Sequence, residues 1–257
     1  MFDIIRSRLT QGYRTMKYPH GPAPELPEQF VGKPEIQINK CKNNCEFKCI
    51  NVCPTGALNT ININNEKKIS LDMGKCLFCK ACQNSCSHHA INFSRDYKLS
   101  TFTREGLVIK ENDIPKSCTS NEKIKKMFGR SLKLRQVSAG GCNACEADTN
   151  VLNTLAWDLD RFGIQFVASP RHADGLFITG PVTQNMKKAL LKTYEAVASP
   201  KIVIAAGACA ISGGPYIGHK EVCDGVTDIL PVDLFIPGCP PHPLTILDGL
   251  LGFLELI

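Results

Sequence analysis

The stretch Cys76-Leu-Phe-Cys-Lys-Ala-Cys-Gln-Asn-Ser-Cys86 decides the fold of the first half of this chain. Two, two and three residues separate its cysteines, so three sulfurs of one short loop surround one centre and the fourth reaches a neighbouring centre. Thiolate sulfur is a soft ligand that suits iron clusters, and a [4Fe–4S] cube needs four such ligands. Zinc sites usually pair two Cys-x2-Cys knuckles at a distance, so zinc is the minor alternative. Ser87, His88 and His89 replace the usual proline, and we expect both histidines to be surface or packing residues.

Another four cysteines lie upstream with wider gaps: Cys41, Cys45, Cys49 and Cys53. We call them the first motif, and Cys76–Cys86 the second motif. One extra residue in each of the first two gaps demands a different loop path, which leaves open a lost or altered cluster. All four thiols are nevertheless present, and without this set Cys86 lacks a partner cube. We therefore predict two cubes with crossed ligands. The first takes Cys41, Cys45, Cys49 and Cys86, and the second takes Cys76, Cys79, Cys82 and Cys53.

These motifs lie in an internal repeat over residues 35–115. An apolar run precedes each motif, at Ile36–Lys40 and Ile69–Lys75, and another follows each, at Gly56–Ile61 and Ala90–Phe93. Two halves of strand, cluster loop, short helix and strand form a small pseudo-symmetric module. Its apolar core is modest, so we expect the clusters to hold it together.

Residues 1–34 precede this module. Met1–Met16 mixes apolar residues with three arginines at a spacing compatible with a short amphipathic helix. We expect this helix to pack on its own protein or on a partner subunit, with contact to a membrane surface as the weaker alternative. Five prolines between positions 19 and 34 then predict an extended arm.

The second half, residues 131–257, follows a linker at 116–130 and alternates β-rich runs with helical patterns. The expected strands are Leu132–Val137, Ile164–Ala168, Leu176–Thr179, Lys201–Ala206 and Val232–Ile236. The expected helices are Ala147–Arg161, Gln184–Val197 and Pro243–Leu254. Such alternation favours a mainly parallel sheet covered on both faces, with ligands beyond the carboxyl ends of its strands. Cysteines follow the first, fourth and fifth strands, so three remote segments converge on one edge and predict a third cube on Cys142, Cys145, Cys209 and Cys239.

The composition excludes several classes of protein. With 43% hydrophobic and 21% charged residues, the chain is an ordinary globular protein rather than a disordered one. We find neither an apolar run of about 20 residues nor a signal-peptide core, so we expect reduced thiols in the cytosol rather than disulfides. Residues 1–130 carry a net charge of +9 and residues 131–257 one of −3. The basic residues can offset negative clusters, and because they are dispersed without a recognition motif we expect no nucleic-acid partner. Cys118 and Cys223 complete no set of four and are expected to be ordinary thiols.

Motifs throughout the second half resemble a known family. They are Gly140-Gly-Cys-Asn-Ala-Cys-Glu146, Ser169-Pro-Arg-His-Ala-Asp174, Gly180-Pro-Val-Thr183, Gly207-Ala-Cys209 and Pro237-Gly-Cys-Pro-Pro241. They are similar to the small subunit of group 4 [NiFe] hydrogenases, which includes that of formate hydrogenlyase and is related to the 20 kDa terminal-cluster subunit of complex I. The resemblance implies a flavodoxin-like, three-layer α/β/α domain with one [4Fe–4S] cluster. The separated pair Cys142-Asn-Ala-Cys145 is the hydrogenase form, whereas the quinone-reducing relatives are expected to use adjacent cysteines.

The first half resembles a second family. Met1-Phe2, the proline-rich arm, Val31-Gly-Lys-Pro-Glu35 and Gly74-Lys-Cys-Leu-Phe-Cys79 are similar to the two-cluster, ferredoxin-like adapter subunit of the same assemblies. The chain thus looks like a fusion of two neighbouring subunits, an α+β ferredoxin-like domain followed by the α/β domain. The resemblance implies an electron-transfer subunit that is not catalytic alone and lies peripherally on the inner, cytoplasmic face of the cell membrane. Its implied partners are a [NiFe] large subunit, other iron–sulfur subunits or a soluble ferredoxin, and indirectly antiporter-like membrane subunits.

Several alternatives stay open at this point. The chain can instead be the terminal-cluster subunit of a complex I-like quinone oxidoreductase, a freestanding electron carrier or redox sensor, or a structural adapter with degenerate clusters. Glu146 can assist proton movement near a partner, or cap or ion-pair the start of a helix. Arg171, His172 and His242 can hydrogen-bond near the third cluster or the partner, or simply fix their loops.

Overall fold

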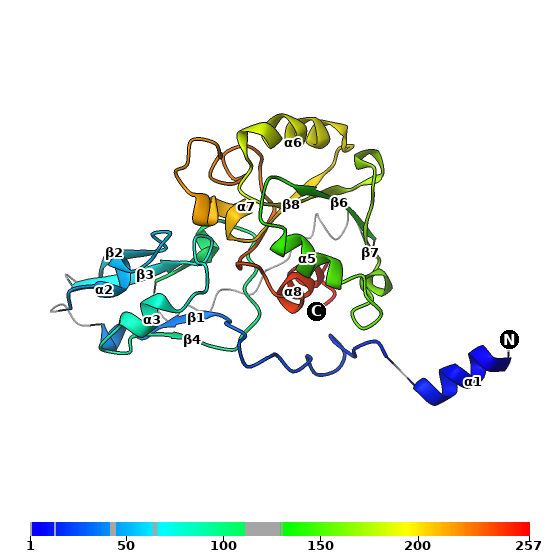
Figure 1. Ribbon diagram of the computed structural model, residues 1–257, viewed down its shortest axis with the longest axis horizontal. Coiled ribbons are helices and arrows are strands. Elements are labelled where there is room, and N and C mark those ends of the chain that lie inside the picture. Colours follow the sequence, from blue (N-terminus) through cyan, green and yellow to red (C-terminus); the bar gives the residue numbers. More distant parts are fainter. Residues whose placement is uncertain (1, 13, 42–44, 64–65, 111–128, 130) are drawn as a thin grey trace.

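The computed structural model describes residues 2–12, 14–41, 45–63, 66–110, 129 and 131–257. The cysteine-rich first half lies beside the α/β second half, and helix α1 (Phe2–Gln11) projects from the far end of the molecule (Figure 1). Of the expected linker at 116–130, only Gly129 lies in the described ranges. Cys118 therefore lies outside them.

The first half contains the expected repeat of strand, loop, short helix and strand. Its first copy comprises β1 (Pro34–Ile36), η1 (Ile38–Lys40), α2 (Lys48–Asn51) and β2 (Leu58–Ile63). Its second copy comprises β3 (Glu66–Asp72), α3 (Ala81–Ser85) and β4 (Ile91–Phe93), followed by η2 (Glu105–Leu107) and β5 (Val108–Ile109). Antiparallel pairs join β1 to β4 and β2 to β3, so each copy contributes one strand to each pair. This cross-pairing brings the two cysteine motifs together.

The second half is built on a five-stranded, wholly parallel sheet. Its strands are β6 (Leu132–Ser138), β7 (Ile164–Phe166), β8 (Gly175–Thr179), β9 (Ile202–Ala206) and β10 (Leu234–Ile236). They lie in the order β10-β9-β8-β6-β7, which is the flavodoxin-like order with a reversal between the first and third strands. The predicted parallel sheet and flavodoxin-like architecture are therefore confirmed.

Helices cover both faces of this sheet, as expected. Helices α5 (Ala144–Val151) and α8 (Pro243–Phe253) lie on one face, where α8 is buried over most of its length. Helices α6 (Gln184–Ala196) and α7 (Ala208–Ser212) pack on the other face (Figure 1). The remaining helical turns are η3 (Leu159–Phe162), η4 (Pro170–His172) and η5 (Gly214–Tyr216).

Helix α5 differs from the helix expected at Ala147–Arg161. It begins three residues earlier and ends at Val151. The hydroxyl of Thr154 donates to the carbonyl oxygen of Val151 at 2.7 Å, so a side chain takes an acceptor that a continuing helix needs. Asp158 then adopts a left-handed conformation (φ 48°), which excludes a regular helix through this position. The apolar periodicity alone did not reveal this stop.

The two halves share a packed interface. The Ser212 hydroxyl donates to the carbonyl oxygen of Gly74 at 2.7 Å, joining α7 to the loop after β3. Thr101 pairs with Phe235 through two backbone hydrogen bonds of 2.8 and 3.0 Å. One continuous cluster of buried apolar side chains extends from the cores of the first half to the α6 face of the sheet. The cysteine motifs of the first half are thereby held against the carboxyl edge of the sheet.

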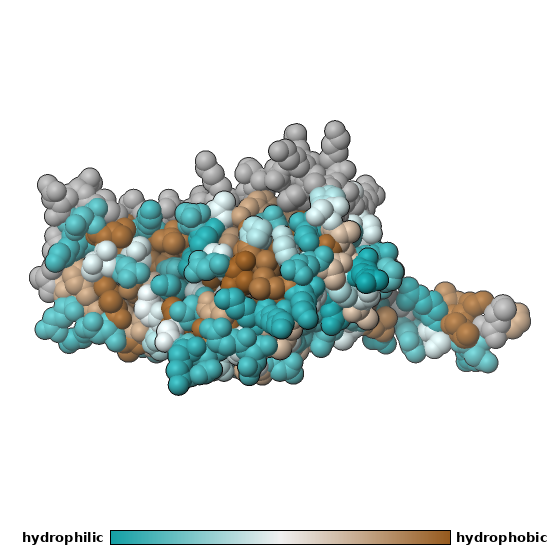
Figure 2. Space-filling model, turned by 90° about the horizontal axis from the view of Figure 1, so that it is seen from above, coloured by the Kyte–Doolittle hydropathy of each residue, from teal (hydrophilic) through white to brown (hydrophobic). Residues whose placement is uncertain are grey.

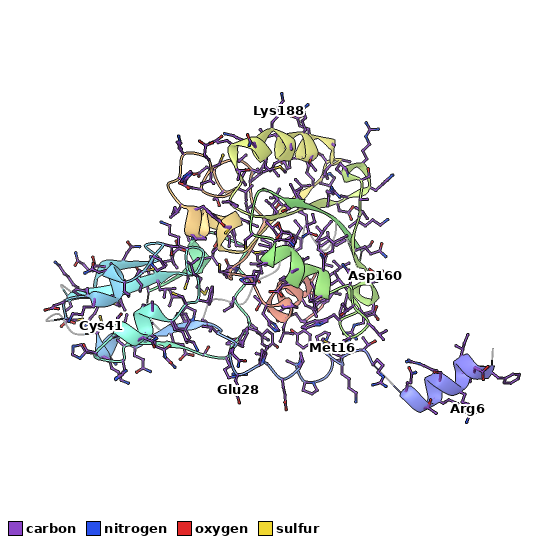
Figure 3. All side chains as sticks on the ribbon, in the orientation of Figure 1. Arg6, Met16, Glu28, Cys41, Asp160 and Lys188 are labelled. Atoms are coloured by element: carbon purple, nitrogen blue, oxygen red, sulfur yellow. The ribbon has the colours of Figure 1, made fainter. Side chains whose placement is uncertain are left out.

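The proline-rich arm is extended, as predicted, and it packs along the second half. Tyr18 is buried and its hydroxyl donates to an Asp248 carboxylate oxygen at 2.7 Å. Arg161 donates to the carbonyl oxygens of Met16 and Tyr18 at 2.6 and 2.8 Å. Figure 3 shows Met16 against the second half and Arg6 far out on the projecting helix.

Helix α1 does not pack on its own protein, because none of its residues is buried. Figure 2 shows both hydrophobic and hydrophilic surface on this projecting segment. Four of its apolar side chains are exposed, namely Phe2, Ile4, Ile5 and Leu9. In the ranges that the structure describes, we find no helix with the length and apolar character needed to cross a membrane.

Candidate iron–sulfur sites

Three cysteines of the first motif, Cys41, Cys45 and Cys49, lie close to Cys86 of the second motif. Burial raises the pKa of Cys49 to about 11, and the neighbouring Cys86, Cys45 and Cys41 contribute to the rise. The pKa of Cys41 is also raised, by burial and then by Cys45 and Cys86, while Lys68 acts in the opposite direction. Cys86 therefore belongs in space with the first motif, as the crossed arrangement requires.

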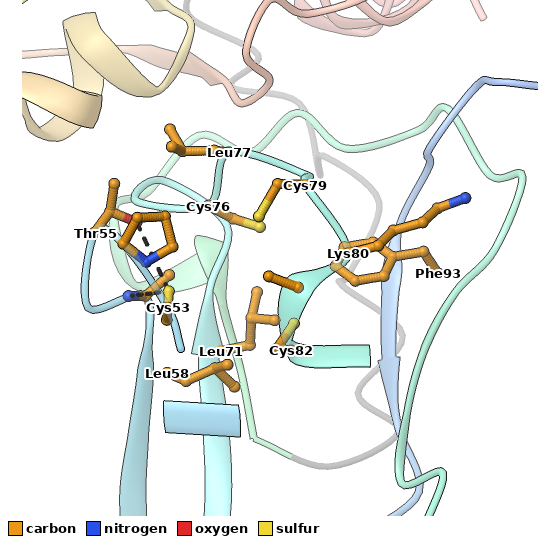
Figure 4. Close-up of a pocket in the computed structure, with 13 residues that line it drawn as sticks. Cys53, Thr55, Leu58, Leu71, Cys76, Leu77, Cys79, Lys80, Cys82 and Phe93 are labelled. Atoms are coloured by element: carbon orange, nitrogen blue, oxygen red, sulfur yellow. Dashed lines mark hydrogen bonds between the residues drawn. The ribbon is translucent and has the colours of Figure 1, made fainter. Parts of the chain in front are cut away.

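The cysteines of the second motif surround a hollow together with Cys53 of the first. Figure 4 shows the side chains of Cys53, Cys76, Cys79 and Cys82 around this hollow, which contains about 310 Å³ of empty space including its mouth. Burial raises the pKa of Cys76 to about 12, with further contributions from Cys82, Cys53 and Cys79. The pKa of Cys82 rises to about 11, again through burial first and then Cys53 and Cys79. These four thiols are close enough to one another to bind one cluster, and their assignment as ligands stays a prediction.

The four cysteines of the second half meet at the carboxyl edge of the parallel sheet. Cys142 and Cys145 follow β6, Cys209 lies in α7 directly after β9, and Cys239 follows β10. The pKa of Cys145 is raised by burial and then by Cys209, Glu146, Cys239 and Cys142. Burial and the nearby Cys239 and Cys142 raise the pKa of Cys209 to about 12. Three loops that are remote in sequence thus bring four thiols together.

We call these groups the first set (Cys41, Cys45, Cys49 and Cys86), the second set (Cys53, Cys76, Cys79 and Cys82) and the third set (Cys142, Cys145, Cys209 and Cys239). A common turn presents one cysteine of the first set, one of the second and two of the third at the start of a short helix. In α2, α3, α5 and α7 the second residue is a cysteine, and the residue that caps each helix has a positive φ. These capping residues and angles are Phe47 (49°), Lys80 (60°), Asn143 (69°) and Gly207 (90°). Positive φ is uncommon outside glycine and tends to cluster at functional sites. Its recurrence beside four cysteines in two unrelated halves indicates a shared requirement for the placement of sulfur.

Backbone amides donate hydrogen bonds to three of the cysteine sulfurs. Ala57 N–H donates to Cys53 Sγ at 3.2 Å, and Phe78 N–H donates to Cys76 Sγ at 3.3 Å. Ala90 N–H donates to Cys86 Sγ, also at 3.3 Å. Such bonds stabilise thiolate ligands and tune the potential of a cluster. Sequence reasoning missed these three donors, and no residue-type signal was available because they act through the main chain.

Two glycines let the backbone approach sulfurs of the third set closely. A Cβ atom on Gly207 would lie 2.6 Å from Cys145 Sγ, and one on Gly214 would lie 2.8 Å from Cys209 Sγ. Any larger residue at either position would therefore press on a sulfur. Soft thiol donors in groups of four fit iron–sulfur clusters.

The separation of the sulfurs bears on the type of metal centre. Over the described ranges, we find no three His, Cys, Asp or Glu side chains grouped closely enough to hold one metal ion. A [4Fe–4S] cube binds its four thiolates on four different irons, so its ligands stand farther apart than the four ligands of one zinc ion. The thirteen cysteines that the structure describes all have free thiols.

The first, second and third sets lie next to one another in this order. Cys82 of the second set contributes to the raised pKa of Cys49 in the first, after burial and the nearer thiols of that set. Cys79 of the second set likewise contributes to the raised pKa of Cys239 in the third, after burial and Cys142. The second set therefore lies between the first and the third.

Glu146 is fixed at the carboxyl ends of two strands. It is only 7% exposed, and its Oε1 accepts hydrogen bonds from the hydroxyls of Ser138 (2.5 Å) and Thr179 (2.6 Å). These contacts hold the carboxylate beside the third set, since Glu146 follows Cys145 in the chain. Its role in proton movement stays a prediction.

The structure does not bring Arg171 and His172 to the cysteines. Both are exposed in η4, which precedes the amino end of β8, whereas the third set lies beyond the carboxyl ends of the strands. Their role at a partner interface stays a prediction. His242 instead fixes its loop, because its Nδ1 accepts from Leu244 N–H at 3.1 Å at the start of α8. Its ring packs edge-on against Phe30, and burial lowers its pKa.

The remaining candidates lie outside the three sets. Cys223 is partly buried against the apolar core. His88 is half-buried and lines the hollow beside Cys45, Cys49 and Cys86, whereas His89 is exposed.

Comparison with known proteins places this architecture in a family. The family model described as "NADH ubiquinone oxidoreductase, 20 Kd subunit" matches residues 142–253, which include all four cysteines of the third set. A probable membrane-bound hydrogenase subunit of Pyrococcus furiosus is 42% identical over 130 residues, covering 51% of this chain and 78% of that protein. Formate hydrogenlyase subunit 7 of Escherichia coli is 42% identical over 154 residues, covering 56% of this chain and 60% of that protein. An NADH-quinone oxidoreductase subunit of Carboxydothermus hydrogenoformans is 43% identical over 112 residues, covering 43% of this chain and 68% of that protein. The chain therefore belongs to the family of the 20 kDa subunit of NADH–ubiquinone oxidoreductase.

Proposed function

We propose that this chain is an iron–sulfur electron-transfer subunit of a membrane-associated group 4 [NiFe] hydrogenase of the formate hydrogenlyase type. The observation that carries this proposal is the contiguity of the three cysteine sets: helices α2 and α3, which contain Cys49 and Cys82, pack together, and the loop Leu77–Phe78 lines one hollow with Cys239. Relatives named as a membrane-bound hydrogenase subunit and a formate hydrogenlyase subunit support the choice of assembly.

We assign two [4Fe–4S] clusters to a ferredoxin-like domain at 35–115 and one to the α/β domain at 131–257, with 116–130 as linker. The ligand sets are Cys41, Cys45, Cys49 and Cys86, then Cys76, Cys79, Cys82 and Cys53, then Cys142, Cys145, Cys209 and Cys239. A [4Fe–4S] cluster, when bound, supplies one-electron redox chemistry. The chain's own residues hold it, exclude water and stabilise its thiolate ligands. Burial of Cys49, Cys76 and Cys209 supports the exclusion of water, and the amides of Ala57 and Phe78 support the stabilisation.

The proposed redox partner is a separate large subunit with a [NiFe] centre, so the chain is not active alone. Electrons are exchanged with other iron–sulfur subunits or a soluble ferredoxin, and antiporter-like membrane subunits are indirect partners. We place the chain peripherally on the inner face of the cell membrane. The membrane-bound relative supports this location.

A second candidate is the terminal-cluster subunit of a complex I-like quinone oxidoreductase. The similarity to the NADH-quinone oxidoreductase subunit of Carboxydothermus hydrogenoformans favours it. The separated pair Cys142-Asn-Ala-Cys145 favours the hydrogenase, because the quinone-reducing relatives are expected to use adjacent cysteines. A quinone-dependent activity of the assembled complex would decide for this second candidate.

Anaerobic purification of the tagged full chain from its native host tests the proposal. We expect a [NiFe] large subunit to copurify and about twelve irons per chain, four for each cube. The Cys209→Ser variant should retain about eight irons, whereas Cys223→Ser, a matched control outside the three sets, should retain about twelve. Wild-type preparations with eight irons or fewer, or without a nickel-containing partner, would contradict the assignment.

A further inference from the structure

Strand β6, which lies next to the edge strand β7, has a neighbour on one side only over residues 135–138. β7 pairs with β6 from Leu132 to Leu134, and Val167 N–H then donates to the carbonyl oxygen of Leu134 at 2.9 Å. Beyond this point β6 continues to Ser138 with β8 as its neighbour. In the part of the chain that the structure describes, no strand pairs with the other side of residues 135–138.

The alternation of strand hydrogen bonds identifies the groups on this open side. Lys133 C=O accepts from Asp174 N–H at 2.7 Å and Ala139 N–H donates to Thr179 C=O at 2.8 Å, so the odd-numbered residues of β6 face β8. Leu132 N–H donates to Gly163 C=O at 2.9 Å, so the even-numbered residues face β7. The N–H and C=O groups of Gln136 and Ser138 therefore face the side that β7 leaves open.

An open groove lies along this edge. Its floor is residues 135–138, and it contains about 980 Å³ of empty space including its mouth. One wall consists of Glu146 and Asn150 on α5, and the other consists of Met186, Ala189 and Thr193 on α6. Because α5 and α6 cover opposite faces of the sheet, the groove lies where the next strand of the sheet would run.

We propose that an extended segment of the large partner subunit adds a strand to this edge and pairs its backbone with Gln136 and Ser138. An extended peptide offers alternating donors and acceptors at a repeat of about 6.8 Å for two residues, which matches these groups. Arg135 lines the groove and forms no ion pair with any residue that the structure describes, so an acidic side chain of the segment complements it. Met186 and Ala189 accept apolar side chains on the α6 wall.

This inference rests on the proposed function and adds how the partner binds. Ser138 ends β6, and its hydroxyl holds the carboxylate of Glu146, the residue next to Cys145. A strand added along residues 135–138 would therefore run directly toward the third cysteine set.

A proline substitution tests the pairing at one amide. Gln136→Pro removes an N–H on the open side, and its ring obstructs an incoming strand, while the hydrogen bonds to β8 come from the odd-numbered residues. Gln136→Thr, the matched control, keeps the N–H. Full-length, cluster-loaded chains are titrated with the separately purified large subunit of the same assembly. We expect the proline variant to bind at least about tenfold more weakly and the threonine variant to stay within about twofold of wild type.

Hydrogen–deuterium exchange on the wild-type chain supplies a second readout that does not depend on folding of the variant. The amides of Gln136 and Ser138 should exchange rapidly in the free chain and become protected in the complex. Equal binding by both variants, or unchanged exchange, overturns the strand addition and leaves the proposed function intact. Protection that appears without the large subunit, as the chain concentration rises, assigns the edge to a second copy and also overturns it. A wild-type chain that does not bind the large subunit overturns both proposals.

Discussion

The two halves of this chain place their cysteines in opposite ways. In the first half, eight cysteines lie within residues 41–86, and five of them belong to the buried core themselves: Cys41, Cys49, Cys76, Cys82 and Cys86. In the second half, four cysteines extend from the edge of a sheet whose strands β8 and β9 are buried at every residue. In the first half most of the cysteines are part of the core, whereas in the second half only Cys209 of the four is buried and the core of the sheet consists of other residues.

Removal of iron should therefore have the largest effect, and a different one in each half. We expect a chelator under reducing conditions to abolish hydrogen-exchange protection in β1–β4, because the proposed clusters supply much of the interior there. Protection in β8 and β9 should persist, since both strands are buried at every residue and each is paired on both sides within the parallel sheet. Mass-spectrometric exchange on loaded and stripped chains measures both. If the β2–β3 pair stays protected in the stripped chain, the first half does not depend on its clusters for folding and the two halves do not differ in this respect.

The crossed ligands give the next largest effect. Cys86→Ser should abolish the same electron paramagnetic resonance signal as Cys41→Ser, although Cys86 lies in the second motif. Cys53→Ser should likewise match Cys76→Ser. Each substitution should remove up to about four irons per chain.

The control for this series is Cys223→Ser, which should leave the iron content and both signals unchanged. If Cys86→Ser instead abolishes the signal that Cys76→Ser abolishes, each motif binds its own cluster and the crossed assignment is wrong.

The same contrast explains which features could be predicted from sequence. Local spacing in Cys76–Cys86 indicated a cluster loop, and alternating strands and helices indicated a parallel sheet that gathers Cys142, Cys209 and Cys239. Both signals are properties of residue type and periodicity, which a sequence displays directly. The ligand roles of these cysteines stay a prediction.

Other features had no such signal. The amide donors to sulfur act through the backbone, and the Ser212–Gly74 contact between the halves depends on tertiary packing. The early end of α5 follows from a single hydroxyl of Thr154 that competes for a helix carbonyl. Glycine at 207 and 214 was visible, but the sulfur beside each became apparent only in three dimensions.

Gly207→Ala should perturb the third cluster alone, with a smaller effect. Its Cβ would lie 2.6 Å from Cys145 Sγ, so the sulfur must move. Gly218→Ala is the matched control, because Gly218 also has a positive φ (76°) but has no atom within 4 Å of the added Cβ. Both variants place alanine at a positive φ, with Gly207 (φ 90°, ψ 154°) in a region that is almost restricted to glycine, and only Gly207→Ala also displaces a sulfur.

The measurement is the midpoint potential and occupancy of the third cluster. We expect Gly207→Ala to shift the potential or lower the occupancy, and Gly218→Ala to leave both unchanged. Signals from the first two clusters should stay constant in both variants, because Gly207 belongs to the second half. Identical behaviour of the two variants would show that the space beside Cys145 is not required.

The smallest effect is a pH dependence of stability that centres on Asp248 in α8 of the second half. Burial raises the pKa of Asp248, while the Tyr18 hydrogen bond and Lys98 lower it and Asp96 raises it. A carboxyl group whose pKa is raised by folding stabilises the folded state most below its unfolded pKa, and this contribution is lost as the pH rises through its folded pKa. Wild type should therefore lose stability relative to Asp248→Asn as the pH rises from about 4 toward neutrality. Trp157, the single tryptophan, lies in this half and reports its unfolding by fluorescence.

This dependence should have the same sign in loaded and iron-stripped chains, because we expect the sheet and α8 to stay folded without the clusters. Urea unfolding of both proteins across this pH range measures it, with Asp248→Asn as the reference that does not titrate. A wild type that gains stability relative to the variant as the pH rises would show that the hydrogen bond from Tyr18 outweighs burial. If the pH dependence of stability disappears when the iron is removed, the second half needs its cluster to fold.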